Sequence, residues 1–108
     1  METIKENREF RRAYHKGIKG VAPFVVVYCL KSRTDSKFGI TVSKKIGKAV
    51  VRNRIKRLIR ESLRTYADSL EGTFNIVVVA RTAAAKATFS QIKNSLENAL
   101  LQVGAISR

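Results

Sequence analysis

Residues 44–64 read KKIGKAVVRNRIKRLIRESLR, a stretch that combines a helical apolar pattern with concentrated positive charge. It holds nine basic residues and one acid, Glu61, and so carries a net charge of +8 out of +14 for the whole chain. Apolar side chains recur at helical spacing, at Val51, Ile55, Leu58, Ile59, Leu63 and Tyr66. The pattern predicts a long helix over about 49–66 with one face buried in the core.

The basic side chains of this helix form an arc beside the apolar stripe, while Arg54 falls on the far side of the stripe. The arc consists of Arg52, Lys56, Arg57, Arg60 and Arg64. A basic helix face often does no more than keep a protein in solution. Solubility, however, needs mixed signs and a modest net charge, and like charges four residues apart destabilise a helix. A face of nearly one sign therefore favours a polyanionic partner whose phosphates neutralise it.

The overall composition points in the same direction. A chain of 108 residues predicts one domain over 1–108. A pI near 10.7 indicates nucleic acid first, with an anionic membrane surface as a weaker alternative. We see no apolar run that could span a bilayer, and the charged opening METIKENREFRR predicts no signal peptide. Cys29 is the only cysteine, which fits a reducing, cytoplasmic setting.

A short helix is predicted over 7–16, with Asn7 as its N-cap and Gly17 as its stop. Phe10 and Tyr14 share one face of this helix, among arginines and lysines. The simpler interpretation is that they anchor the helix to the core. The alternative is that they line a groove in which bases stack beside basic side chains.

Three apolar runs predict strands: 24–30 (FVVVYCL), 37–43 (KFGITVS) and 74–80 (FNIVVVA). The first and third are almost continuously apolar, which predicts burial on both faces and a central place for 74–80. The short turn between the first two predicts an antiparallel hairpin. A further short strand is expected near 19–22.

The last helix is predicted to begin after Thr88, which forms a capping box with Gln91, and to end at Gly104. The elements then follow the order α-β-β-β-α-β-α. This order predicts an α+β domain, with three helices packed on a small mixed central sheet.

The groups that catalysis requires are absent. His15 is the only histidine, and Cys29 cannot form a metal cluster with it. The acids are scattered and offer no close carboxylate set for two magnesium ions; they are Glu2, Glu6, Glu9, Asp35, Glu61, Asp68, Glu71 and Glu97. The sequence therefore predicts no catalytic residue and no metal site on the protein. The loop 44–48 lacks the Walker pattern, although its lysines and amides suit a phosphate.

The residues AVVRNRIKRLIR at 49–60, with GITVSKKIGKAV at 39–50, closely resemble the protein component of bacterial ribonuclease P. The first helix (EFRRAYHKG) and the strand regions FVVVYCL and FNIVVVAR are also similar to that family, so the resemblance covers nearly the whole chain. It implies an RNA-dependent endonuclease that removes the 5′ leader from precursor tRNA. In that family the RNA subunit carries the active site and the catalytic Mg²⁺. We expect the protein to lower the magnesium requirement by screening the repulsion between substrate and catalytic RNA.

The resemblance also assigns residues and topology. Residues implied to face the catalytic RNA subunit are Arg52, Asn53, Arg54, Lys56, Arg57 and Arg60. Residues implied to line or flank a cleft for the precursor tRNA leader are Phe10, Tyr14, Tyr28, Lys44 and Lys45. One protein per RNA is expected. The family fold contains a left-handed β-α-β crossover, against the general rule that about 98% are right-handed.

Two other classes of function remain open from composition alone. One is a ribosomal or other structural RNA-binding protein with no part in cleavage. The other is a metal-dependent nuclease acting by itself, which the scattered acids disfavour.

Overall fold

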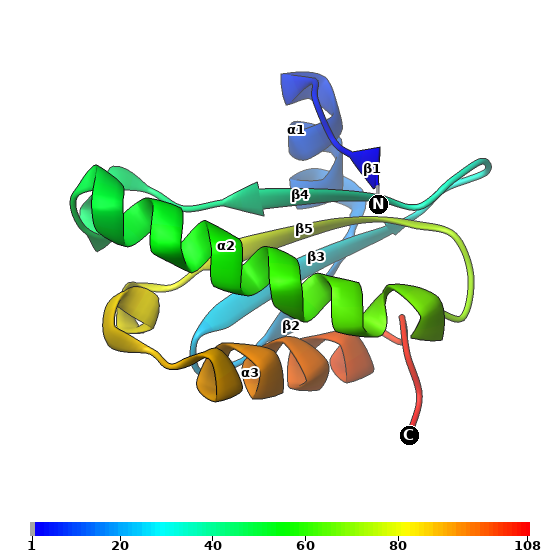
Figure 1. Cartoon of the computed structure of the whole chain (residues 1–108). Helices are drawn as coiled ribbons and strands as arrows, with labels where there is room; N and C mark the ends of the chain where they lie inside the picture. Colours follow the sequence, from blue (N-terminus) through cyan, green and yellow to red (C-terminus); the bar gives the residue numbers. More distant parts are fainter. Residues whose placement is uncertain (1) are drawn as a thin grey trace.

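The computed structural model describes residues 2–108 and contains the three predicted helices on a five-stranded sheet (Figure 1). The helices are α1 (Asn7–Lys16), α2 (Ala49–Tyr66) and α3 (Phe89–Gln102). The strands are β1 (Glu2–Thr3), β2 (Ile18–Val21), β3 (Val25–Lys31), β4 (Lys37–Thr41) and β5 (Phe74–Ala80). Short 3₁₀ turns are η1 (Lys44–Ile46), η2 (Ala67–Ser69) and η3 (Thr82–Lys86).

The sheet is mixed, in the order β1-β4-β5-β3-β2, and β5 occupies its centre as predicted. β5 runs antiparallel to β3 and parallel to β4, with Lys31 opposite Phe74 and Lys37 opposite Asn75. The predicted hairpin between the first two strands is therefore wrong, because β5 lies between them. A short turn brings two strands close together, but it does not prevent a later strand from pairing with both of them.

The connection from β4 through α2 to β5 is left-handed, in agreement with the expectation from family resemblance. Figure 1 shows both strands running from right to left, with α2 returning in front of the sheet and β5 below β4. When the sheet is viewed from the side that α2 covers, with β4 and β5 pointing up, β5 lies to the left of β4. A right-handed connection between the same strands would place α2 on the opposite face, which α1 covers.

Both faces of the sheet are buried by helices, and β5 shows this most clearly. Ile76 and Val78 point into the larger core beneath α2 and α3, whereas Val77 points into a smaller cluster beneath α1. All three side chains are completely buried. The smaller cluster also contains Ile4 and Ala13. The sheet is therefore the middle of three layers, with two helices on one face and one on the other.

β1 is an element that the sequence did not predict. It pairs in parallel with β4, and the amide of Ile4 donates a 2.9 Å hydrogen bond to the carbonyl of Phe38. Two residues are too few to show a strand period. The expected short strand near 19–22 is present one residue earlier, as β2.

The helix ends partly follow the predicted signals. Thr88 and Gln91 form the predicted capping box, with hydrogen bonds of 2.9 and 3.2 Å. Glu6 rather than Asn7 is the N-cap of α1, and no side chain caps that end. Gly17 does end the helix, and a Cβ there would lie 2.5 Å from the carbonyl oxygen of Ala13. Gly17 thus permits a close approach of two backbones.

Replacing Ile59 on α2 by alanine should lower the free energy of unfolding by about 2–5 kcal/mol, because it leaves a cavity in a fully buried site. The matched control is Val50→Ala on the same helix. Val50 is 80% exposed, and its replacement should change stability by less than about 0.5 kcal/mol. Urea denaturation at constant m-value measures both changes. Equal losses for the two variants would contradict the packing described.

Candidate RNA-binding surfaces

The outer face of α2 carries most of the basic residues that the sequence singled out. Ile55, Ile59 and Leu63 are buried and hold the opposite face against the sheet and α3. Asn53, Arg57 and Arg60 are consequently exposed, while Arg52 and Lys56 are half-buried at the edge of the helix contact. Five of the six residues expected to face a catalytic RNA thus lie along or beside one open helix face.

Arg54, the sixth, has a different environment. Its guanidinium donates one hydrogen bond of 2.7 Å to the carbonyl of Ala87 and a longer one of 3.5 Å to the carbonyl of Ala85. These contacts agree with its predicted place on the far side of the apolar stripe. The guanidinium therefore connects α2 to the segment that precedes α3.

The aromatic residues expected in a leader cleft come together on the other face of the sheet, under α1. The rings of Tyr14 and Tyr28 meet edge to face, with centroids 5.0 Å apart. The hydroxyl of Tyr14 lies 3.0 Å from that of Thr41. Phe10 rests on the backbone of Gly39, where a Cβ would lie 2.5 Å from its ring. The three aromatic rings thus anchor α1 to the sheet.

Phe10 and Tyr14 also border an open groove, whereas Tyr28 does not line it; all three aromatic residues are half-buried. The groove has a volume of about 530 Å³ and is lined by Asn7, Phe10, Arg11, Tyr14 and Thr41. Lys19 lies over the Tyr28 ring, with its Nζ 5.9 Å from the centroid. Anchoring and base stacking are therefore compatible roles for these rings.

Lys44 and Lys45 lie outside the lining of this groove. Both are exposed on η1, which follows the end of β4 after Thr41. In the chain they lie between Thr41, which lines the groove, and the N-terminal end of α2.

Three groove residues were not predicted: Asn7, Arg11 and Thr41. The signals for two of them were nevertheless present. Arg11 follows Asn7 by one helical turn, and Thr41 alternates with the apolar positions of β4, which directs it toward the face that α1 covers.

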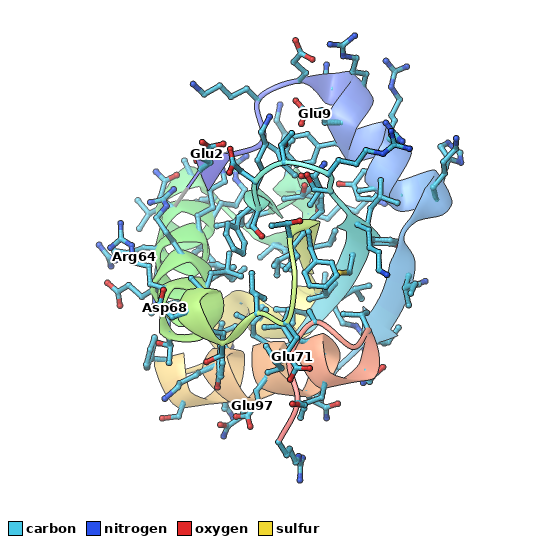
Figure 2. All side chains as sticks on the ribbon, turned by 90° about the vertical axis from the view of Figure 1, so that its right-hand side faces the viewer. Glu2, Glu9, Arg64, Asp68, Glu71 and Glu97 are labelled. Atoms are coloured by element: carbon cyan, nitrogen blue, oxygen red, sulfur yellow. The ribbon has the colours of Figure 1, made fainter. Side chains whose placement is uncertain are left out.

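Acidic residues gather at the end of the molecule where β3 and α2 end and β4 and β5 begin. Figure 2 looks onto this end, with the labelled Glu2, Glu9, Asp68, Glu71 and Glu97 spread across it. Glu9 lies 3.6 Å from the Nζ of Lys37, and Glu97 accepts a 2.9 Å hydrogen bond from the hydroxyl of Tyr66. Burial and this contact with Glu97 raise the pKa of Tyr66 to about 12.

The opposite end, with η1, η3 and the N-terminal ends of α2 and α3, is basic. The segments at this end, 42–52 and 81–90, contain no acid and include Lys44, Lys45, Lys48 and Lys86. A polyanion can therefore approach this end without like-charge repulsion.

Two further findings concern the chemistry available. Within residues 2–108, no three histidine, cysteine or acidic side chains are grouped to hold a metal ion. Burial raises the pKa of the Cys29 thiol to about 11, so the thiol stays protonated at neutral pH.

Of the helices between residues 2 and 108, none has both the length and the apolarity to cross a bilayer.

Comparison with known proteins confirms the resemblance found in the sequence. The ribonuclease P family model matches residues 1–104. A ribonuclease P protein component from Clostridioides difficile is 40% identical over 97 residues, which cover 88% of this chain and 85% of the relative. The corresponding protein from Clostridium kluyveri is 40% identical over 104 residues, covering 94% of this chain and 93% of the relative.

Solved structures agree in fold. The RNase P protein of Staphylococcus aureus matches 99% of both chains, with a TM-score of 0.89 and 38% identity. The RNase P protein of Thermotoga maritima matches 94% of this chain and 96% of its own, with a TM-score of 0.82 and 31% identity. The chain therefore belongs to the ribonuclease P protein family, the protein subunits of the ribonuclease P endoribonuclease.

Proposed function

We propose that this protein assists a catalytic RNA subunit in removing the 5′ leader from precursor tRNA by binding both RNAs on separate surfaces. The outer face of α2 would bind the catalytic RNA, and the groove beneath α1 would bind the single-stranded leader. The observation that carries the proposal is the placement of these two surfaces on opposite faces of one sheet. One small domain can therefore contact two RNA segments at once.

The α2 face suits a phosphate backbone. Arg57 and Arg60 are exposed, and the buried Nε of Arg52 has no hydrogen-bond partner within residues 2–108. A phosphate oxygen would accept charge-assisted hydrogen bonds from the guanidinium groups along this face.

The groove suits a flexible single strand. Half-buried aromatic rings beside Arg11 and Lys19 offer stacking and positive charge together. Base stacking contributes about 1–3 kcal/mol per base with little sequence preference. That property fits a subunit that must accept many different leaders.

Magnesium enters this proposal through the RNA. The catalytic Mg²⁺ ions would be held mainly by the RNA subunit, as the family resemblance implies. The protein would contribute by screening the repulsion between two polyanions, a task that metal ions otherwise perform. Adding protein should then lower the magnesium concentration that cleavage requires.

The direct test is cleavage of precursor tRNA at low Mg²⁺ by bacterial catalytic RNA alone, by the protein alone and by both together. We expect leader removal only with both components, because the protein supplies charge and shape rather than reacting groups. Cleavage by the protein alone would support an independent nuclease. Unchanged cleavage despite confirmed binding of the catalytic RNA would support a structural RNA-binding protein.

Arg52→Ala should weaken binding to the catalytic RNA and reduce the slope of log K against log salt by about one, because one phosphate contact is lost. Arg33→Ala is the matched control, since Arg33 is an exposed arginine in the β3–β4 turn at the acidic end. Titrations across a salt series measure both variants. The α2 assignment fails if the two variants show the same slope.

Phe10→Leu should reduce the affinity of the holoenzyme for precursor tRNA but leave that for mature tRNA unchanged. Leucine preserves apolar packing on Gly39 and removes the aromatic face, so the loss should approach the stacking contribution of about 1–3 kcal/mol. Binding of the two tRNA forms is measured side by side. An equal loss for both would contradict leader binding in this groove.

A further inference from the structure

The two arginines of the Arg-Asn-Arg motif have different surroundings. Arg52 lies at the edge of the open basic face, with its Nε unpartnered within the described part of the chain. Arg54 reaches across to the turn before α3 and donates to the carbonyls of Ala85 and Ala87. Such a fork is specific to a guanidinium, whose donors have a fixed planar geometry.

Lys86 lies between the two carbonyls that Arg54 binds. It is exposed, whereas Ala84 and Ala87 on either side of it are almost completely buried. η3 packs against both η1 and α2. The η3 segment that carries Lys86 consequently lies at the same acid-free end of the molecule as residues 44–48, next to the N-terminal end of α2 (left side of Figure 1).

The segment that carries Lys86 is held by the burial of Ala84 and Ala87 in the main core and by a small number of hydrogen bonds. The amide of Ala84 donates to the carbonyl of Arg81, and that of Ala87 donates to Ala84, so both bonds are internal to the turn. Arg81 holds the start of the segment through the carbonyl of Ala22, at 2.9 Å. The Arg54 fork adds a side-chain connection from α2 to the carbonyls on either side of Lys86, and so fixes the backbone at that residue.

We infer that Arg54 is a positioning residue, and that Lys86, which it holds beside the α2 face, is a further contact with the phosphate backbone of the catalytic RNA. This inference rests on the proposed function and extends its RNA surface from α2 to η3. The partner is a polyanion because the neighbouring side chains are lysines and arginines, with no acid between residues 72 and 96.

The experiment measures binding of the full-length protein to bacterial catalytic RNA across a salt series. Lys86→Ala should reduce the slope of log K against log salt by about one, as expected for one lost phosphate contact. Lys93→Ala is the matched control, because Lys93 lies on α3 one helical turn before Glu97. If Lys86→Ala and Lys93→Ala give the same slope of log K against log salt, the proposed contact between Lys86 and the RNA is overturned.

Double variants separate positioning from direct contact. Arg54→Ala should lower the slope by about one because it releases Lys86, and adding Lys86→Ala to it should cause no further change. Arg52→Ala with Lys86→Ala should instead lower the slope by about two, since independent sites add. A reduction of two for the Arg54/Lys86 pair would show that Arg54 contacts phosphate itself.

Arg54→Lys keeps the charge but cannot form the fork, so it should reproduce the slope of Arg54→Ala. A slope like that of the unchanged protein would overturn the positioning role. Circular dichroism checks that each variant is folded, and Lys86→Ala tests the RNA contact even where an Arg54 variant unfolds. The same series tests the proposed function separately. If Arg52→Ala leaves the slope of log K against log salt unchanged, the proposed function is contradicted, whatever the slope of Lys86→Ala.

Discussion

The rest of the structure depends on the burial of β5 on all sides. Its side chains are apolar in both directions, and Ile76, Val77 and Val78 are completely buried. A strand of this kind needs a neighbour at each edge and a helix layer on each face. β3 and β4 provide the edges, α2 and α3 cover one face, and α1 covers the other. The outer face of α2 and the groove beneath α1 are thereby directed to opposite sides of the molecule.

The charge distribution follows from the same architecture. α2 begins at the end of the molecule where β4 and β5 finish, and it ends where Glu9 meets Lys37 and Tyr66 meets Glu97. The basic half lacks such partners, and an anion bound there would stabilise the fold by mass action. Its arginines are not equivalent, however. Arg54 and Arg81 donate to backbone carbonyls within the domain, so net charge alone overstates the positive charge that is free to meet RNA.

Local patterns predicted the elements well where a signal is contained within a few turns of chain. The bounds of α1 and α2 agree with the predicted ranges 7–16 and 49–66, and the capping box at Thr88 is present. The predicted hairpin failed because strand pairing depends on the whole sheet: a later strand, β5, binds both earlier ones. β1 was missed because two residues show no period. The aromatic positions of the candidate cleft could be proposed in advance. Local spacing also gave a signal for Thr41 and Arg11, but only the packing of α1 on the sheet brings them into one groove.

By itself, the sequence determined the helices and the strands other than β1, the apolar faces, the excess of positive charge and the family, because each of these depends on residue type and short spacing. Only the tertiary structure decided the strand order, the position of α2 that makes its connection left-handed, and the engagement of Arg54 with the turn before α3. These features depend on contacts between residues far apart in the chain, such as the 33 positions between Arg54 and Ala87. Periodicity shows which face of an element is buried, whereas the neighbour that buries it is chosen by the packing of the whole domain.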